Sequence, residues 1–422
     1  MPKRYVTILG KAVRAVARLR GGGSALPGLV VERIDPSFIK DTLATVPLGV
    51  VIISGTNGKT TTTKMVVELL EGQGLKVFTN KTGSNFTRGV AAALLGDISI
   101  NGHLDADIAV LELDEAHATY FVRTIPPKYS LILNVMRDQL DRFGEIDTTT
   151  ELLRTITTAT TDTVVLNRED SRIASLQQTL VTQRATFFGL SDNLLSTFPS
   201  DDNLHGGTSR LATAHAGVIL KGFLKQAATF SVDGKDIEVP MKLTGIYNVY
   251  NAAAALALVR VIIGDTADQK SLVSTLSHIT PAFGRGETFI IDGTPLELIL
   301  VKNPSGFRLG LQSFNPEGYV TMIAINDNYA DGRDMSWLWD VSFESLSAEG
   351  VEQISGIRAY DMALRLQYDE VPISNVTPHL RRALKQFLSD NTKRPKRIYC
   401  TYTAMLTLRR SIAKIVEVEP IG

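Results

Sequence analysis

The stretch SGTNGKTTTT, residues 54–63, constrains the fold of this chain more than any other feature. It follows an apolar run, GVVIISG at 49–55, and it leads into a helical pattern, TTTKMVVELLEGQGL at 61–75. It matches G-x-x-G-K-T, a shorter form of the phosphate-binding loop G-x-x-x-x-G-K-[ST]. Gly55 and Gly58 let the backbone curl so that successive N–H groups point at phosphate beside a helix N-terminus. A strand, a phosphate loop and a helix in this order predict a nucleotide-binding α/β domain.

The polar residues of this loop have the chemistry that a nucleoside triphosphate needs. Lys59 supplies a positive charge to the β- and γ-phosphates, and the Thr60 hydroxyl is suited to bind Mg²⁺. Glu112 ends the apolar run ADIAVLEL, so we expect it at the carboxyl edge of a parallel sheet, where ligands bind. An unpaired carboxylate there is costly, so we predict that Glu112 is a Mg²⁺ ligand and a catalytic residue. The residues that we expect at the nucleotide are Gly55, Thr56, Asn57, Gly58, Lys59, Thr60 and Thr61.

Asp114 and Glu115 follow Glu112 directly. Each has either a role near the metal or a solvated or helix-capping role, and the sequence leaves these alternatives open.

Apolar runs typical of buried strands alternate with helical patterns through the first part of the chain. The predicted strands are at 49–55, 76–80, 106–113, 129–135 and 162–167. Nearly continuous apolar strands that alternate with helices predict a parallel sheet covered on both faces. The segment from about 190 to 235 is rich in Ser, Asp, Gly, Thr and His, and we interpret it as a short insertion or β-excursion. A helix is predicted to begin near Tyr247.

The stretch TPAFGRGE at 280–287 marks a boundary, after which a second, smaller α/β unit begins. Its predicted strands are at 296–301, 319–327, 356–360 and 397–403. The predicted organisation is a basic leader helix and linker at 1–46, an ATP-binding domain at 47–284 and a C-terminal α/β domain at 285–422.

Charge and apolar content exclude several classes of protein. Lys+Arg and Asp+Glu are equal at 44 each, so no global field favours nucleic acid. No apolar run approaches the roughly 18–20 residues that span a bilayer, and the N-terminus lacks a signal peptide, so we expect a cytoplasmic protein. The first twenty residues form an amphipathic helical pattern with six basic and no acidic side chains. This helix either lies on the anionic inner face of the cell membrane or packs on the first domain.

Several motifs together resemble those of the Mur ligases, ATP-dependent enzymes that activate a carboxylate as an acyl phosphate and couple an amine to it. The motifs are GTNGKT, the strand-end Glu112, NVMRDQLDRFG (134–144), GIYNVYNAAAA (245–255) and GRGE (284–287). The resemblance implies a central phosphate-loop ATPase domain with a parallel sheet, followed by a smaller Rossmann-like α/β domain. It places Asn248, Asn251 and Arg285 around the nucleotide.

The resemblance also implies substrate contacts. Family members commonly have histidine where this chain has Gln139, so a metal-ligand role is not expected there. The candidate substrate residues are Asn85, Asp138, Asp141, Arg142, Lys302 and Asn303.

Two differences from the amino-acid-adding Mur ligases indicate which branch of the family this chain resembles. Only 54 residues precede Gly55, too few for the UDP-binding domain with which amino-acid-adding Mur ligases begin. The C-terminal unit carries KNPSGF (302–307) and NDNYADGRDMSWLWD (326–340), which are similar to motifs of the MurT family, the Mur-ligase-like subunits of lipid II isoglutaminyl synthase. Many of those proteins have a four-cysteine zinc ribbon in the central domain. Residues 1–399 contain no cysteine, so no zinc is expected, and the segment at about 190–235 takes the place of the ribbon.

This resemblance implies an amidation in peptidoglycan biosynthesis, with ATP and Mg²⁺ as cofactors. The α-carboxylate of D-glutamate in the lipid II stem peptide is phosphorylated, and ammonia displaces the phosphate to give D-isoglutamine. The ammonia comes from a partner subunit, a GatD-like class I glutamine amidotransferase.

The residues agree that ammonia is made elsewhere. Glutamine hydrolysis needs a cysteine activated by histidine, but Cys400 lies in the apolar run RIYCTYT with no histidine nearby, so we expect it to pack in the core. A Cys–His pair is oriented by an acidic group, and in the MurT family the aspartate that matches Asp334 is thought to supply it to the partner. We therefore predict a catalytic role in trans for Asp334, with a turn or helix cap as the alternative.

The neighbours of Asp334 receive other interpretations. Asp331 and Asp340 are expected to cap turns or helices, and Trp337 and Trp339 either contact the partner or pack in the core, on opposite faces if the chain is extended.

Two other functions are compatible with the phosphate loop. A stand-alone amide ligase similar to folylpolyglutamate synthase would use glutamate as amine donor and would not explain DGRDMSWLWD. A non-catalytic nucleotide-binding scaffold would tolerate loss of Glu112.

Overall fold

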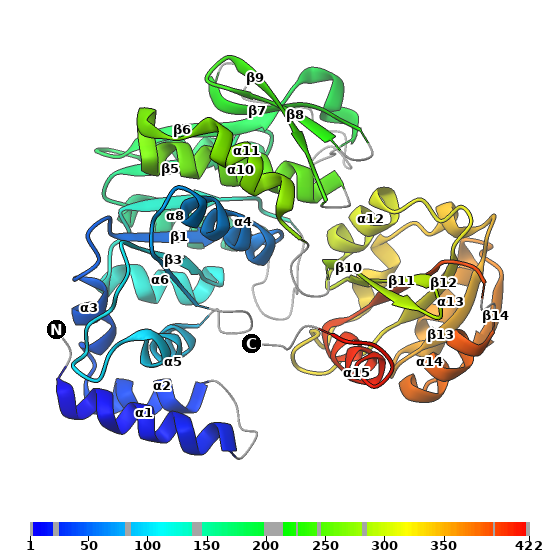
Figure 1. Cartoon of the computed structure of the whole chain (residues 1–422). Helices are drawn as coiled ribbons and strands as arrows, with labels where there is room; N and C mark the ends of the chain where they lie inside the picture. The colour runs from blue at the N-terminus through cyan, green and yellow to red at the C-terminus, as the bar shows by residue number, and fades with distance from the viewer. Residues whose placement is uncertain are drawn as a thin grey trace.

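A computed structural model of the whole chain shows two separate sheets, each with helices on both faces (Figure 1). The N-terminal and central parts lie on the left of the figure and the C-terminal part on the right. The structure describes residues 3–19, 25–80, 86–136, 146–197, 214–224, 227–242, 246–280, 285–390 and 393–418.

The central sheet has the strand order β2-β3-β1-β4-β5-β6-β7-β8-β9. Neighbours from β2 to β7 pair in parallel, whereas β7, β8 and β9 pair antiparallel. The strands are β1 (Val50–Ser54), β2 (Val77–Thr79), β3 (Ile108–Glu112), β4 (Tyr129–Ile132), β5 (Thr163–Asn167), β6 (Arg184–Leu190), β7 (Ala216–Leu224), β8 (Ala227–Val232) and β9 (Lys235–Pro240). The predicted parallel sheet is confirmed.

Alternate side chains of β1 explain why both faces are covered. Val51 and Ile53 enter one buried cluster, with α4, α10 and α11, while Val50 and Ile52 enter the other, with α5, α6 and α8. A strand that is apolar at every position needs helices on both sides. These helices are α4 (Lys59–Gly72), α5 (Thr87–Asp97), α6 (Glu115–Thr124), α8 (Ile146–Ala159), α9 (Ser171–Ser175), α10 (Ile246–Ile263) and α11 (Gln269–His278), with 3₁₀ turns η1 (Leu176–Thr179), η2 (Asp192–Thr197) and η4 (Gly264–Thr266).

The polar segment at about 190–235 is a β-excursion where the structure describes it. It contains the end of β6, the turn η2, and the strands β7 and β8, which with β9 extend the sheet as an antiparallel edge. Residues 198–213 lie outside the described residues.

Within the described residues, three helices precede β1: α1 (Arg4–Leu19), α2 (Ala25–Ile34) and α3 (Phe38–Leu43). Helix α1 packs on α2 and α5, and its buried Val6 joins the cluster on that face of the sheet. The predicted leader helix therefore does pack on the first domain, at its lower edge in Figure 1.

The C-terminal sheet has the order β10-β11-β15-β12-β13-β14, in which only β10 and β11 pair antiparallel. Its elements are β10 (Arg285–Ile291), β11 (Thr294–Leu300), α12 (Pro304–Ser313), β12 (Val320–Ala324), η5 (Ser336–Asp340), η6 (Glu344–Leu346), β13 (Val351–Ser355), α13 (Ala359–Tyr368), β14 (Ile373–Val376), α14 (Leu380–Ser389), β15 (Lys396–Cys400) and α15 (Tyr402–Ile412). The strand begins at Arg285 as the sequence boundary suggests, while the division into independent domains stays a prediction.

The predicted strand at 356–360 is wrong. The strand is β13, which ends at Ser355, and the following residues form the turn into α13. Gly356 has a φ of +97°, which breaks the strand because this backbone conformation suits glycine only.

The two faces of the C-terminal sheet carry separate cores. Helices α12 and α13 and the turn η5 cover one face with Phe307, Trp337 and Met362, and helices α14 and α15 cover the other with Leu384 and Met405.

Among the described helices, only the stretch Tyr247–Thr266, at α10, is long and apolar enough to cross a membrane. More than half of it is buried inside the protein, where it packs against α4 and the central sheet.

Candidate active site

The phosphate loop has the backbone geometry that the sequence predicts. Gly55 and Gly58 have φ values of +126° and +90°. A Cβ at Gly55 would lie 2.9 Å from the backbone nitrogen of Asn134, and one at Gly58 would lie 2.7 Å from Oδ1 of Asn251. Glycine is therefore required at both positions, by conformation and by close approach. The second contact also brings Asn251 of α10 against the loop.

Lys59 is buried at the start of α4 and forms an ion pair with Glu115. Its Nζ lies 2.9 Å from Oε1 of Glu115, and it also donates to the carbonyl oxygen of Gly55. Both side chains are more than nine-tenths buried. Glu115 is therefore not solvated. Sequence reasoning missed its role as the partner of the phosphate-loop lysine, although its place just after a strand end was a signal.

Thr60 and Glu112, the two predicted Mg²⁺ ligands, are in direct contact, and their metal role stays a prediction. The Thr60 hydroxyl donates to Oε1 of Glu112 over 2.9 Å. Asn80, at the end of β2, holds the backbone of Glu112 by accepting from its N–H (2.9 Å) and donating to its carbonyl (2.7 Å). Sequence reasoning missed Asn80, whose signal is a polar residue that ends a strand next to β3.

Asn134 supports the loop from the end of β4. Its side chain accepts from the backbone N–H of Asn57 (2.8 Å) and donates to the carbonyl of Asn57 (3.0 Å). Its own carbonyl accepts from the N–H of Thr56. The resemblance drew attention to the motif that begins at Asn134 but not to this residue, which fixes the path of the phosphate loop.

The C-terminal domain contacts the phosphate loop through Asn303. The amide of Asn303 donates to Oδ1 of Asn57 over 3.1 Å, and its Oδ1 caps α12 by accepting from the N–H of Gly306. Asn303 is fully buried, and its side chain connects the phosphate loop to the start of α12. Its predicted contact with substrate or phosphate stays a prediction.

A cavity of about 130 Å³ lies between the phosphate loop, α10 and α12. It brings together six residues that the sequence assigned to nucleotide or substrate: Asn57, Gly58, Thr61, Asn248, Asn251 and Lys302. Apolar residues of β11 and α12 line its opposite wall. Groups that are far apart in the sequence thus face one cavity, as expected for a nucleotide that lies between the two domains.

Several predicted residues cannot be placed. Asn85, Asp138, Gln139, Asp141 and Arg142 lie outside the described residues. Arg285 begins β10, but its side chain is also outside what the structure describes.

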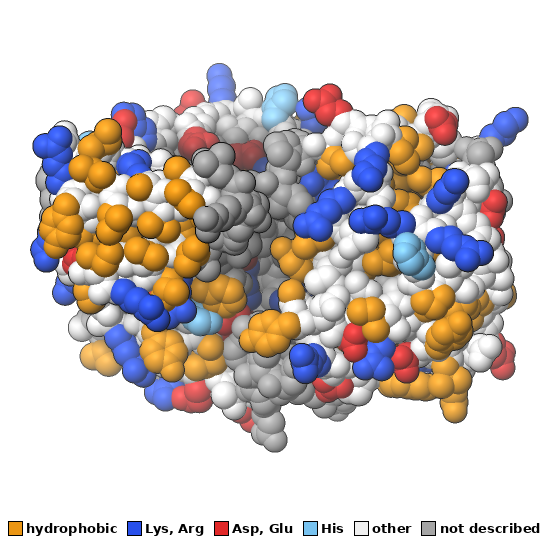
Figure 2. All heavy atoms as spheres, turned by 90° about the horizontal axis from the view of Figure 1, so that it is seen from below, with side chains coloured by type: hydrophobic (Ala, Val, Ile, Leu, Met, Phe, Trp, Pro, Cys, Tyr) orange, Lys and Arg blue, Asp and Glu red, His pale blue; other side chains and the backbone are white. Residues whose placement is uncertain are grey.

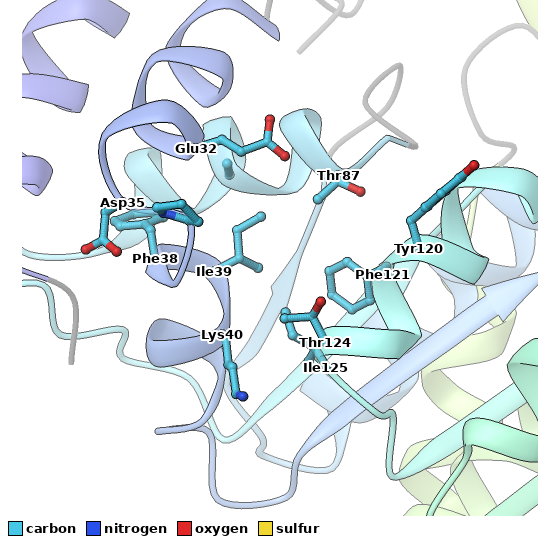
Figure 3. Close-up of a pocket in the computed structure, with 12 residues that line it drawn as sticks. Glu32, Asp35, Phe38, Ile39, Lys40, Thr87, Tyr120, Phe121, Thr124 and Ile125 are labelled. Carbon is cyan, nitrogen blue, oxygen red and sulfur yellow. The ribbon is translucent and has the colours of Figure 1, made fainter.

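Figure 3 shows a second cavity, of about 180 Å³, between α2, α3, α5 and α6. Ile39 and Phe121 lie toward its centre, whereas the carboxylate of Asp35 points away from it. None of the residues that the sequence assigned to the site lines this cavity. It is separate from the nucleotide site.

The DGRD turn holds two aspartates in different environments. Asp331 is buried and accepts from the N–H of Thr403 (2.7 Å), from the Thr403 hydroxyl (2.5 Å) and from the N–H of Asn328 (3.1 Å). It thereby caps α15 from a distant loop, and its burial raises the pKa of this carboxyl group. Asp334 is only half-buried and accepts from the N–H of Ser336 over 2.9 Å, and its hydrogen bonds with Ser336 lower its pKa.

The two tryptophans lie on a 3₁₀ turn, η5, so the condition of an extended chain does not apply to them. Trp337 is buried in the core beside Phe307. Trp339 is half-exposed and meets the ring of Tyr368 edge-on, with centroids 5.0 Å apart. Arg365 braces this turn by donating to the carbonyls of Leu338 and Val341. One tryptophan is therefore a core residue, and the other lies at the surface.

Cys400 is fully buried on β15, and this burial raises its pKa well above the ordinary value. Its thiol is a packing group, as predicted, and is not placed to act as a nucleophile.

Comparison with known proteins decides the family. The family description "Mur ligase middle domain" matches residues 53–259, and "MurT ligase C-terminal" matches residues 300–405. The MurT subunit of lipid II isoglutaminyl synthase (glutamine-hydrolyzing) from Streptococcus pneumoniae R6 is 30% identical, over 96% of each chain. This chain belongs to the MurT family. The MurT subunit from Staphylococcus aureus strain COL is 28% identical, over 86% of each chain. The resemblance stated from the sequence motifs is confirmed.

Solved structures confirm the fold expected of a MurT protein. MurF ligase from Thermotoga maritima in complex with ADP has a TM-score of 0.68 at 17% identity, with 90% of this chain and 83% of that chain covered. Folylpolyglutamate synthase from Mycobacterium tuberculosis complexed with ADP has a TM-score of 0.66 at 14% identity, with 93% and 99% covered. A pseudomurein peptide ligase type C from Methanothermus fervidus has a TM-score of 0.67 at 19% identity, with 90% and 81% covered. At these identities the likeness establishes the Mur ligase fold and not the substrate.

Proposed function

We propose that this chain is the ATP-dependent synthetase subunit of a lipid II isoglutaminyl synthase. The observation that carries the proposal is the cavity at which the phosphate loop, the asparagines of α10 and the KNPSGF loop of the C-terminal domain meet. The MurT relatives, which match nearly the full length of the chain, supply the substrate class. The substrate is the α-carboxylate of D-glutamate in the lipid II stem peptide, and the product is D-isoglutamine.

The phosphate loop would hold the triphosphate for transfer of the γ-phosphoryl group to this carboxylate. Lys59 would bind the β- and γ-phosphates and, together with the loop N–H groups, stabilise the charge that develops during transfer. Ammonia would then attack the acyl carbon, the C–O bond to phosphate would break, and the nitrogen would lose a proton as the amide forms. Closure by Asn57 and Asn303 would keep water from the acyl phosphate.

Thr60 and Glu112 fit a Mg²⁺ ion. Both are hard oxygen ligands, and their oxygens lie 2.9 Å apart at the carboxyl edge of the sheet. Within the described residues, no group of three or more His, Cys, Asp and Glu side chains is placed to hold a metal, which suits an ion that takes its other ligands from phosphate and water. Mg²⁺ bound there would neutralise charge on the transferring phosphoryl group.

The ammonia would come from a GatD-like class I glutamine amidotransferase. Asp334 is half-exposed on a braced turn, so its carboxylate is available to a partner. An aspartate is ionised at neutral pH, and the hydrogen bonds with Ser336, which lower the pKa of Asp334, favour this form further. In the partner it would accept from the catalytic histidine and orient that ring toward the cysteine.

An aromatic surface next to this turn supports a partner at this face. Helix α13 exposes Tyr360, Leu364 and Tyr368, one per turn on the same side, and Trp339 extends the strip through its contact with Tyr368. Aromatic side chains are enriched at protein–protein interfaces, and three of these four exposed residues are aromatic. We propose that the glutaminase subunit covers this aromatic strip and receives Asp334 at its edge.

Mass spectrometry of the stem peptide tests the function. The chain would be incubated with ATP, Mg²⁺, lipid II and either glutamine with the partner subunit or an ammonium salt alone. The expected result is conversion of the carboxylate to an amide, with phosphate release, in both mixtures. An unchanged stem peptide in the presence of active partner and intact lipid II would refute the proposed function. Transfer of glutamate instead would favour the folylpolyglutamate-synthase-like alternative.

A further inference from the structure

Helix α1 has an apolar face that the protein does not cover. The helix already buries Val6 and Ala17 against α2 and α5. A second set of apolar side chains points outward, at the helical spacing i, i+3, i+4, i+7 and i+11: Tyr5, Ile8, Leu9, Ala12 and Val16. Tyr5 is 60% exposed and Ile8 is 50% exposed. A surface helix normally has polar residues on this side, so these residues, here called the α1 strip, need another explanation.

The charged residues of helix α1 itself are all positive. Helix α1 contains no acidic residue, and Lys3 and Arg4 are exposed at its start. Leu26 of the neighbouring helix α2 is 53% exposed and adds to the apolar area. An amphipathic helix with exposed apolar side chains and basic flanks is suited to the boundary between lipid head groups and acyl chains.

Helices α14 and α15 of the C-terminal domain repeat this charge pattern. Neither contains an acidic residue, although the chain has 44 in total. Arg381, Arg382 and Lys385 are exposed on α14, and Arg410 is exposed on α15. These side chains are here called the basic face. They lie on the side of the C-terminal sheet opposite to α13, because α13 belongs to one core cluster and α14 and α15 to the other. The basic face is therefore distinct from the aromatic strip.

The α1 strip and the basic face lie on one side of the molecule. In Figure 1, α1 and α2 form the lower edge of the central part, and α14 and α15 lie low in the C-terminal part. Figure 2 shows this side from below, with hydrophobic side chains gathered on its left half over α1 and α2 and Lys and Arg side chains gathered on its right half. Exposed apolar side chains on a helix without acidic residues on one half, and exposed basic side chains on the other, favour an anionic lipid surface over nucleic acid. Nucleic acid would bind the basic side chains but offers no apolar phase for the α1 strip.

We propose that this side of the protein docks on an anionic phospholipid bilayer, with the α1 strip inserted between the head groups and the basic face lying on the lipid phosphates. Docking would hold the chain at the membrane by two weak contacts, one in each domain, so that neither alone has to be strong. The link to lipid II rests on the proposed function, whereas docking itself needs only the bilayer.

Vesicle sedimentation tests the proposal with the full-length chain, without ATP or lipid II, so its outcome is independent of the ligase assay. The wild type should bind vesicles of phosphatidylcholine and phosphatidylglycerol, and not vesicles of phosphatidylcholine alone. Arg381→Gln, Arg382→Gln and Lys385→Gln together should weaken binding about a hundredfold, because each basic residue at an anionic surface contributes about fivefold. Ile8→Ser with Leu9→Ser should abolish the part of the binding that survives high salt.

Two matched control variants test whether vesicle binding depends on this surface or only on the total charge and exposed apolar area of the protein. Lys235→Gln, Lys242→Gln and Lys270→Gln remove the same number of exposed charges from β9, the segment after it and α11. Val181→Ser with Leu224→Ser removes two strongly exposed apolar side chains elsewhere. Both controls should bind as the wild type does, and all variants should keep its thermal unfolding midpoint. The proposal is overturned if phosphatidylglycerol does not increase vesicle binding by the wild type, or if the control variants lose as much binding as the matched variants. It is also overturned if the Ile8→Ser, Leu9→Ser variant binds vesicles as the wild type does but loses self-association in light scattering.

Discussion

Replacement of Asp334 by asparagine separates a structural role from a role in the partner's chemistry. Within the described residues, the carboxylate hydrogen-bonds with Ser336 at the start of the turn η5, and it accepts from the N–H of that residue over 2.9 Å. Asparagine caps a turn about as well as aspartate does, so the free energy of unfolding should change by less than about 0.5 kcal/mol. The turn also stays braced by Arg365, which donates to the carbonyls of Leu338 and Val341, and by Arg308, which donates to the carbonyl of Asp340.

The effect on glutamine hydrolysis should be far larger. If Asp334 orients the partner's histidine, its loss should lower the glutaminase rate of the complex by about 10³- to 10⁴-fold, the magnitude seen when the acid of a catalytic triad is made neutral. Amidation of lipid II with an ammonium salt should keep the wild-type rate, because that route does not use the partner's cysteine and histidine. The assay compares glutamate release with stem-peptide amidation in the same complex.

Asp340→Asn is the matched control, since Asp340 lies at the other end of η5. It should leave both rates unchanged. If Asp334→Asn slows the glutamine-dependent and ammonium-dependent reactions equally, Asp334 belongs to the synthetase site or to the fold, and the reasoning is refuted. Equal loss in Asp340→Asn would point to the turn as a whole.

Three further changes test the other parts of the site. Glu112→Gln should abolish phosphate release while the chain still folds, because the amide is a poor Mg²⁺ ligand; normal release in a malachite-green assay would contradict its metal role. Glu115→Ala should lower the unfolding free energy by about 3 kcal/mol, since it leaves Lys59 buried without its carboxylate, and ATP should restore part of this loss in thermal unfolding; no recovery would argue against phosphate binding at Lys59. Asp331→Ala should cost about 3 kcal/mol in urea unfolding, because buried donors lose their acceptor, and a loss below about 1 kcal/mol would show that water replaces it. The two aspartates of the DGRD turn should also have opposite effects on the pH dependence of stability. The pKa of Asp331 is raised in the folded protein, so its contribution to stability is present below its unfolded pKa and is lost as the pH rises through its folded pKa. The pKa of Asp334 is lowered in the folded protein, so its contribution is present above its unfolded pKa and is lost as the pH falls through its folded pKa. Asp331→Asn should therefore make the slope of stability against pH more positive, and Asp334→Asn less positive, between about pH 2 and 6; slopes that move together would contradict the assigned environments.

Local patterns predicted the central parallel strands well because strands such as β1 and β3 are apolar nearly throughout. Such runs have no exposed side, so they indicate a sheet with two covered faces before any partner strand is known. The pattern failed at 356–360, where alternating apolar residues belong to a turn and a helix start. There a glycine with positive φ decides the backbone, and the composition of five residues cannot report it.

The predictions for the candidate site also depended on whether a local pattern reports the contact. The predicted roles of Lys59, Thr60 and Glu112 follow from a motif whose residues are close together or end a strand. The structure brings Thr60 and Glu112 into hydrogen-bond contact. Asn80 and Glu115 were missed because their roles come from packing against other elements.

The sequence by itself predicted a nucleotide-binding α/β protein, because the phosphate loop needs its glycines, lysine and threonine at fixed spacing. The Mur ligase family was recognised from the resemblance of several motifs, of which this loop is one. The sequence also raised the question of ADGRDMSWLWD, in which three aspartates and two tryptophans look equivalent. Only the tertiary structure separates them, by burying Asp331 and Trp337 and leaving Asp334 and Trp339 at the surface. The physical reason is that burial depends on which distant helix, here α12, α13 or α15, packs against each side chain, and no local pattern encodes that contact.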